Sequence, residues 1–242
     1  MFGIQTYPLR IFRICVKTKP DVSLAEACAM QFVASHTSIP VPKVYYAFGH
    51  KGKSYIVMER IKGQMAAFKW TSRHHISKAH ILDQLRGMIN QLHAIPRPEN
   101  VRIGNVLGGS FYDPRLPYRF YWGPFDTVHD FHKALVDGMD LSTPCGLPEV
   151  SELLEYYRRY QGELVFTHAD LSGLNILVRG DDVVGIVDWE TAGWYPGYWE
   201  YTCAKYVNPR NPYWAEPVDH FLTPLPQELA METTRRKYFG DI

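Results

Sequence analysis

The sequence predicts a mixed α/β (α+β) fold in two lobes, and three observations carry this prediction. Short β-branched runs alternate with a single helical run in the first 63 residues. From Ser77 onward the apolar residues follow the period of long helices instead. The chain has 242 residues, of which 46% are apolar, so it can bury a substantial core. We expect a small N-terminal lobe at residues 1–63 and a mainly helical lobe at residues 64–242.

The N-terminal lobe is predicted to contain a strand, a helix and a hairpin. The run Ile11–Thr18 is β-branched and apolar enough for a strand that ends near Lys17. Ser23-Leu24-Ala25-Glu26 has the S-x-x-E form of a capping box, which predicts a helix to about residue 35. The prolines at 40 and 42 cannot continue that helix, so strands are expected at residues 43–48 and 54–60, around a turn at 50–53.

The second lobe begins with a clear amphipathic helix. Its apolar positions recur at spacings of four, three and four, at Ile81, Leu85, Met88 and Leu92. Residues 96–126 are rich in Gly, Pro and aromatic residues without a period, which is typical of a binding loop or lid. Further elements follow in order: helices at 127–140 and 149–161, strands at 163–167, 175–178 and 183–188, and a helical, aromatic remainder.

Composition and charge exclude several classes of protein. A net charge of +1 and a pI near 7.7 disfavour a dedicated nucleic-acid binder, which needs a concentrated basic surface. No run approaches the ~18 apolar residues of a membrane span, and Arg10 and Arg13 interrupt the early apolar stretch, which disfavours a secretory signal. The four cysteines form no C-x-x-C pair and are expected to be reduced. We therefore expect a cytoplasmic protein with no nucleic-acid or membrane partner.

The near-zero net charge hides an uneven distribution. Residues 1–100 carry 14 Lys and Arg against 5 Asp and Glu, whereas residues 101–200 carry 7 against 15. These segments can be two solvated faces. They can also face each other across a site where polyanion and cation, or metal, meet.

Two stretches carry residues suited to chemistry. In Thr167-His168-Ala169-Asp170, followed by Asn175, an Asp and an Asn stand five residues apart in a loop flanked by strands. After one hairpin, Val187-Asp188-Trp189 places another Asp at a strand end. Phosphoryl transfer needs a carboxylate near the attacking hydroxyl and hard oxygen ligands for Mg²⁺. Asx residues are also common in ordinary turns, so it is their joint occurrence that points to this chemistry.

The motifs together resemble the aminoglycoside phosphotransferase-like family, especially its large fungal branch, within the protein-kinase-like superfamily. The resemblance covers nearly the whole chain, and its two motifs after residue 160 are the specific ones. The matching segments are residues 16–17, 23–27, 39–44, 55–59, 84–86, 123–125, 167–171 and 188–196. The resemblance implies a two-lobed protein-kinase-like fold and an ATP-dependent, Mg²⁺-requiring transfer of the γ-phosphate to a hydroxyl of a small molecule.

The resemblance also implies roles for residues of the second lobe. Asp170 would accept or orient the proton of the substrate hydroxyl, and His168 would brace its loop. Asn175 and Asp188 would hold Mg²⁺. Glu190 can lie beside the substrate pocket or anchor nearby backbone. The same two alternatives hold for Glu200.

In the first lobe the resemblance implies a nucleotide site. Lys17 would contact the α- and β-phosphates, paired with Glu26, although a carboxylate at that helix position can also serve only the capping box. The strand that ends in Met58-Glu59-Arg60-Ile61 would lead into the hinge, where backbone groups of Met58, Glu59 and Ile61 meet the adenine.

Departures from the protein-kinase motifs, and motifs that the chain lacks, bear on the rival functions. Asp188 precedes Trp-Glu rather than Phe-Gly, and no A-P-E segment follows, so a small molecule fits better than a protein substrate. The acidic middle of the chain suits a small-molecule substrate that carries positive charge. A zinc hydrolase is disfavoured because the chain lacks H-E-x-x-H. The aromatic cluster at residues 189–201 is expected to be packing rather than a ligand cage.

The front of the chain motivates a second hypothesis. Only sixteen residues precede Lys17, and Gly3 is the single glycine among them, so we expect an N-terminal lobe shortened where the phosphates are usually covered. Ala169 also stands where the family usually has Gly. The alternative function is a catalytically inactive kinase-like binding protein with an incomplete nucleotide lid.

Overall fold

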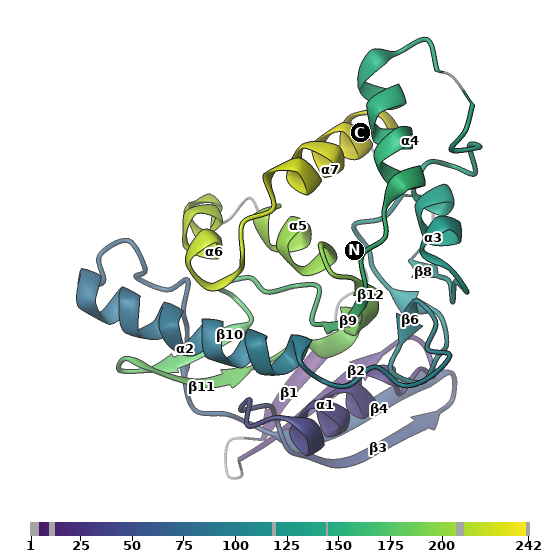
Figure 1. Cartoon of the computed structure of the whole chain (residues 1–242). Coiled ribbons are helices and arrows are strands. Elements are labelled where there is room, and N and C mark those ends of the chain that lie inside the picture. The colour runs from purple at the N-terminus through teal and green to yellow at the C-terminus, as the bar shows by residue number, and fades with distance from the viewer. Residues whose placement is uncertain (1–4, 10–12, 118–119, 144, 207–210, 241–242) are drawn as a thin grey trace.

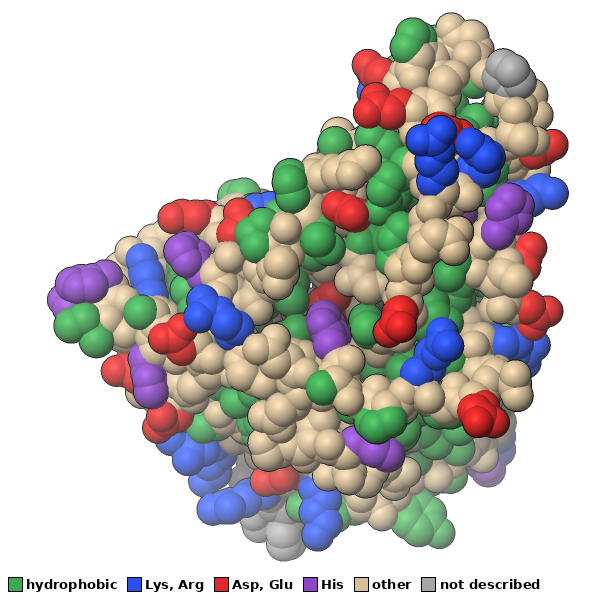
Figure 2. All heavy atoms as spheres, viewed as in Figure 1, with side chains coloured by type: hydrophobic (Ala, Val, Ile, Leu, Met, Phe, Trp, Pro, Cys, Tyr) green, Lys and Arg blue, Asp and Glu red, His purple; other side chains and the backbone are tan. Residues whose placement is uncertain are grey.

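The chain folds into two lobes of mixed α/β structure, as predicted (Figure 1). The computed structural model describes residues 5–9, 13–117, 120–143, 145–206 and 211–240. The strands and helix α1 of the N-terminal lobe lie at the bottom of Figure 1, and the later helices lie above them. Lys and Arg side chains gather along the lower edge of the molecule in Figure 2, in agreement with the basic excess of the first hundred residues.

A four-stranded antiparallel sheet forms the N-terminal lobe. Its spatial order is β1-β2-β4-β3, with β1 (Gln5–Leu9), β2 (Ile14–Lys19), β3 (Val44–His50) and β4 (Lys53–Glu59). The β3–β4 hairpin was predicted, but β1 was not. Pro8 argues against a strand, yet β1 is at the sheet edge, where proline is tolerated. The predicted strand at 11–18 is in fact β2, and its first two positions lie outside the described residues.

Helix α1 (Ala25–His36) follows β2, but the predicted capping box is wrong. Leu24 is the N-cap and makes no side-chain cap hydrogen bond. The Ser23 hydroxyl accepts from the Ala25 N–H at 3.3 Å, and Glu26 turns inward towards β2. Glu26 is 4% exposed, so this carboxylate serves a buried partner rather than the start of its own helix.

The second lobe is built on helix α2 (His75–His93), whose predicted apolar face is confirmed: Ile81, Leu85 and Leu92 are buried, and Met88 packs against the same core. The other helices are α3 (Val128–Leu135), α4 (Pro148–Arg159), α5 (Trp199–Lys205), α6 (Ala215–Phe221) and α7 (Pro226–Phe239), with 3-10 turns η1 (Trp189–Thr191) and η2 (Pro212–Trp214). Helix α3 ends five residues before the predicted position. Asp137 and Gly138 have positive φ values of 54° and 79°, which end a right-handed helix.

Three small antiparallel sheets complete this lobe. Their orders are β11-β10-β5, β6-β12-β9 and β7-β8, with β5 (Gln64–Met65), β6 (Gly104–Asn105), β7 (Phe111–Tyr112), β8 (Tyr121–Trp122), β9 (Leu164–Thr167), β10 (Ile176–Arg179), β11 (Asp182–Ile186) and β12 (Gly193–Pro196). Strand β12 falls in a stretch predicted to be helical. Its backbone pairs with β9 over four residues, so tertiary pairing decides its conformation.

The aromatic cluster at residues 189–201 belongs to the core. Trp189, Trp194, Tyr195, Tyr198, Trp199 and Tyr201 are all at most 5% exposed, which confirms that they pack. All four cysteines are free; Cys203 is buried and the other three are half-buried. Among the described residues, no helix is both long and apolar enough to cross a membrane.

Candidate active site between the two lobes

The loop between β9 and β10 holds Asp170 and Asn175 together. The Asn175 amide nitrogen donates to Asp170 Oδ2 at 2.8 Å and to the Asp170 carbonyl at 2.9 Å. The Asp170 side chain is 41% exposed, so its carboxylate is open to a substrate. Because the amide nitrogen faces Asp170, the Asn175 amide oxygen remains to bind a cation.

His168 braces this loop from beneath and is itself fully buried. Its Nδ1 accepts from the Asp170 backbone N–H at 3.1 Å. Its Nε2 lies 3.0 Å from the Val187 carbonyl, which can only accept, so the proton resides on Nε2. His168 therefore joins the Asp170 loop to the strand end that carries Asp188, and it does so without facing the open side of the site.

Ala169 takes a left-handed conformation with φ of 64°, which costs a non-glycine residue roughly 1–2 kcal/mol. Glu200 of α5 offsets this cost. Its two carboxylate oxygens accept the backbone N–H groups of His168 and Ala169 at 2.8 and 2.9 Å. Of the two expectations for Glu200, backbone anchoring is the one that the structure shows.

Asp188 follows β11 and also has a left-handed backbone, with φ of 66°. Asp tolerates this conformation better than most residues. The turn directs the Asp188 carboxylate towards β2 and α1, and η1 begins at the next residue. The predicted Asp188 and Lys17, 171 positions apart in sequence, thereby come into contact.

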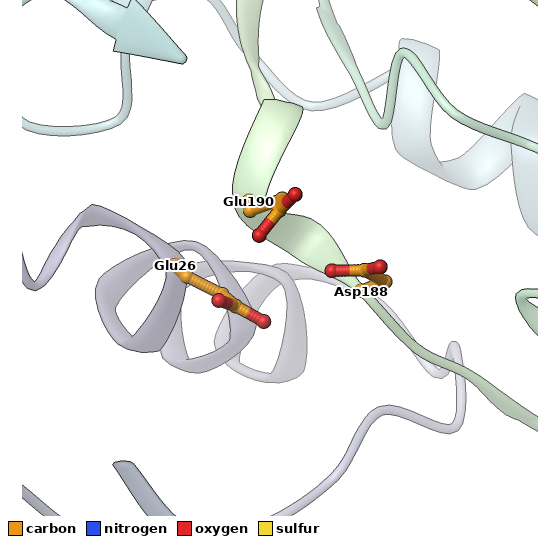
Figure 3. Close-up of side chains that lie close together, drawn as sticks. All are labelled: Glu26, Asp188 and Glu190. Carbon is orange, nitrogen blue, oxygen red and sulfur yellow. The ribbon is translucent and has the colours of Figure 1, made fainter. Parts of the chain in front are cut away.

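Lys17 lies at the centre of a cluster of carboxylates. Its Nζ donates to Asp188 Oδ1 at 2.6 Å, Glu26 Oε1 at 2.8 Å and Glu190 Oε2 at 3.3 Å. Figure 3 shows the three carboxylates pointing towards one another, with Glu26 on α1 and with Asp188 and Glu190 at the start of η1. Oxygen atoms of all three lie within 4.8 Å of one another. The predicted Lys17–Glu26 pair is thus in place.

Lys19 and Glu190 complete the cluster, and neither was assigned there from the sequence. Lys19 Nζ lies 2.8 Å from Glu190 Oε2 and 3.9 Å from Glu26 Oε2. One signal was available: residues two apart on a strand share a face, so Lys19 had to point the same way as Lys17. Glu190 stands in the same relation to Asp188 in sequence, but a 3-10 turn rather than a strand places it.

The charges of the cluster set the protonation of its members. Burial opposes the charge of Lys17, but the carboxylates of Glu26, Asp188 and Glu190 outweigh it and raise the pKa of Lys17 above its ordinary value. Burial also acts to raise the pKa of Asp188, but the Lys17 ammonium outweighs it and holds that pKa below the ordinary value. Both groups are therefore ionised at neutral pH.

A cavity of about 310 Å³ runs from this cluster to the connection between the lobes. Its lining includes Lys17, Asn175 and Asp188, and also Met58, Glu59 and Ile61. Six further lining residues are apolar, namely Met30, Pro42, Met65, Leu174, Leu177 and Val187. The structure thus places the predicted nucleotide and metal residues around one space, and Asp170 adjoins it through Asn175.

This arrangement of a small sheet lobe against a helical lobe, with charged loops between them, is the protein-kinase-like fold of the aminoglycoside phosphotransferases. The chain belongs to the phosphotransferase enzyme family, whose family model matches residues 3–230. No curated protein matches the chain.

Solved structures similar to this chain share its fold at low identity. A thermostable mutant of aminoglycoside phosphotransferase APH(4)-Ia, in a ternary complex with AMP-PNP and hygromycin B, has a TM-score of 0.67 at 14% identity, over 92% of this chain and 76% of that one. The gentamicin complex of APH(2")-IIa has a TM-score of 0.54 at 16% identity, over 93% and 74%. The macrolide 2'-phosphotransferase MphH from Brachybacterium faecium gives 0.55 at 14%, over 93% and 74%.

Proposed function

We propose that this protein is a small-molecule kinase, which transfers the γ-phosphate of ATP to a hydroxyl group in an Mg²⁺-dependent reaction. The observation that carries the proposal is the cavity between the lobes, whose lining combines apolar side chains that suit a base, the residues Met58, Glu59 and Ile61, and the charged Lys17 and Asp188. The nucleotide complexes among structures of this fold support it.

The nucleotide would lie along this cavity with its base at the hinge. The backbone N–H groups of Glu59 and Arg60 already donate to the carbonyls of Lys43 and Arg13, both at 2.8 Å. We therefore assign recognition of the adenine edge to the Ile61 N–H and the Glu59 carbonyl. The phosphates would reach Lys17, which would exchange its contact with Asp188 for phosphate oxygens while Glu26 keeps it oriented.

The donor set fits Mg²⁺, which prefers hard oxygen ligands. Asp188 offers an ionised carboxylate and Asn175 a free amide oxygen. The cluster also carries three carboxylates against two lysines, a formal excess of one negative charge. Bound Mg²⁺ would neutralise charge on the phosphates. Lys17 occupies the centre of the carboxylates, so Asp188 and Asn175, rather than Glu26, would hold the cation.

Asp170 would act on the acceptor. The hydroxyl oxygen forms a bond to the γ-phosphorus as the bond to the β–γ bridging oxygen breaks; ADP leaves, and the hydroxyl proton passes to Asp170. The contact with Asn175 Nδ2 occupies one lone pair of Asp170 Oδ2, and the side chain is still 41% exposed, so the carboxylate can reach the acceptor hydroxyl. The acidic excess of residues 101–200 favours an acceptor with positive charge.

Thermal shift and ADP release test the proposal with two variants and a control. We expect ATP with Mg²⁺ at 100-fold its Kd to stabilise the wild type by about 2.7 kcal/mol, and ATP without Mg²⁺ to stabilise it less. Asp170→Ala keeps this shift but lowers turnover by roughly 10²–10⁴-fold. Asp188→Ala loses the Mg²⁺-dependent part. Asp182→Ala, at a side chain that is 76% exposed, matches the wild type.

Two results would contradict the proposal. Wild-type turnover in Asp170→Ala would remove the role of Asp170. A wild type that shows no Mg²⁺-dependent shift would not be a kinase of this design, and would favour the alternative of a kinase-like binding protein.

A further inference from the structure

The connection between β7 and β8 carries an arginine that contacts the Asp170 loop. Arg115 Nη2 donates to the Ala169 carbonyl at 2.6 Å. Its Nη1 lies 3.6 Å from Asp170 Oδ1. Arg115 therefore contacts both ends of the short Ala169–Asp170 segment, from an element that the sequence predicted only as a binding loop or lid.

Asp113 fixes this arginine in place. Its carboxylate accepts from Arg115 Nε at 2.8 Å and Nη2 at 2.7 Å, in a bidentate pair, and Oδ1 also accepts the Arg115 backbone N–H at 3.0 Å. Asp113 is 1% exposed. A planar guanidinium held on two atoms has little freedom to rotate, so its remaining nitrogen keeps one direction.

We propose that Arg115, oriented by Asp113, is a positioning residue that fixes the Asp170 carboxylate for phosphoryl transfer. The inference rests on the proposed function and deepens it. Without support, the left-handed backbone at Ala169 would relax, since it is strained. Glu200 holds the N–H of Ala169 and Arg115 holds its carbonyl. Both contacts are needed to hold Ala169 at its N–H and at its carbonyl.

The carboxylate of Asp170 is constrained in the same two-sided way. Asn175 Nδ2 donates to Oδ2, while Arg115 Nη1 faces Oδ1. These contacts set the plane of the carboxylate and leave lone pairs on its exposed side for the acceptor hydroxyl. Lysine cannot replace this arginine, because one ammonium cannot hold Asp113 on two atoms and reach Ala169 and Asp170 as well.

A set of variants separates positioning from a purely structural role. The assay is hydrolysis of Mg·ATP with water as acceptor, so it requires no identified substrate. We expect Arg115→Met to lower kcat by about 100-fold, the size of effect that a 1 Å misplacement produces, with the KM for ATP changed by less than about threefold. Asp113→Asn weakens the bidentate pair and lowers kcat by roughly tenfold.

The double variant Asp113→Asn with Arg115→Met is decisive. Arg115→Met alone leaves a buried carboxylate without its cation, which destabilises the fold, and the second substitution removes that charge. The double variant should be more stable than Arg115→Met yet no faster, because both residues act through one guanidinium. If kcat recovers together with stability, the pair is structural only and the proposal is wrong.

Arg158→Met is the matched control. Arg158 holds Glu155 in a bidentate pair of the same geometry, with both contacts at 2.7 Å, on the exposed surface of α4. We expect its kcat and KM to stay within about twofold of the wild type.

A crystal structure of the double variant keeps the test independent of turnover. The Asp170 carboxylate and the Ala169 carbonyl should shift by about 1 Å from their wild-type places. An unchanged segment would overturn the positioning role. If the wild type hydrolyses no ATP with water as acceptor, this structure decides by itself whether Arg115 sets the position of Asp170, while the thermal shift with Mg·ATP decides the proposed function.

Discussion

Glu200 is a fully buried carboxylate whose two oxygens both accept backbone N–H groups. Burying a charge is unfavourable unless its hydrogen bonds are satisfied, and here the charge satisfies two donors of a strained loop. The chain thus places one negative charge beneath the Asp170 loop to hold a conformation that Ala169 does not favour by itself.

Glu200→Gln tests this anchor. The amide oxygen can accept one of the two N–H groups, but the amide nitrogen faces the other and leaves a buried donor unpaired. We expect a loss of about 1–3 kcal/mol in the free energy of unfolding, measured by urea denaturation. The exposed Glu152 of α4 provides the control Glu152→Gln, which should change little. Equal stability of the two variants would show that Glu200 does not anchor the loop.

Single residues differ in how far the sequence defines them. The resemblance pairs Lys17 with Glu26, and these two residues lie in contact at 2.8 Å. Arg115 and Asp113 lie in an aperiodic stretch and match no quoted motif, so their contact with the Asp170 loop depends on how that stretch folds back. Lys19 is intermediate, since its alternation with Lys17 was readable but its partner Glu190 was not.

At the scale of elements, α3 and α4 are joined through a buried histidine. His132 of α3 stacks on Tyr157 of α4, with ring centroids 4.0 Å apart and an interplanar angle of 13°. Its Nδ1 donates to the Tyr157 carbonyl at 3.2 Å and its Nε2 accepts from the Tyr198 hydroxyl at 2.8 Å. The neutral ring satisfies both contacts, whereas protonation of Nε2 would reverse the direction of the second contact and place a positive charge in the core.

This histidine predicts a pH dependence of stability. Burial lowers the pKa of His132 from 6.5 to about 3. The unfolded chain therefore binds the proton first, so stability is full above pH 6.5 and is lost as the pH falls towards 3. Between pH 7 and pH 5 we expect a loss of about 2 kcal/mol from His132.

Urea denaturation at several pH values measures this loss. His132→Phe should be less stable at pH 7, because it loses two hydrogen bonds, but its stability should fall less between pH 7 and pH 5. His50→Asn, at an exposed position of β3, keeps the wild-type slope. A slope that is unchanged in His132→Phe would rule out the buried neutral histidine as its source.

Across the whole molecule, one hydrophobic core joins the two lobes. Met30 and Val33 of α1 belong to the same buried cluster as Phe166 and Trp194 of the second lobe. Phe32 extends this contact, with its ring centroid 4.9 Å from that of Phe166 and 6.3 Å from that of Trp194. Because the two lobes bury these side chains against each other, the stability of each lobe depends on the other.

We therefore expect both lobes to unfold in one transition. All six tryptophans follow residue 63, so their fluorescence reports the second lobe, and amide hydrogen exchange in β2 and β4 reports the first. Phe32→Ala should lower the unfolding free energy seen by both probes by the same amount, about 2 kcal/mol. Loss of protection in β2 and β4 before the tryptophan transition would show that the lobes unfold separately.

The sequence by itself determined the two lobes, the main helix of the second lobe and the identity of the motif residues, because these depend on local periodicity and on residue types at fixed spacings. It did not predict β1, which is an edge strand, and it predicted helix at β12, where pairing with β9 forms a strand instead. It also placed the end of α3 too late, because a backbone turn ends that helix. It left two roles open for Glu26, as a cap of its own helix or as the partner of Lys17, and the structure shows the second. Only the tertiary structure decided which charges face one another, because ion pairs such as Lys17–Asp188 join residues that no spacing relates.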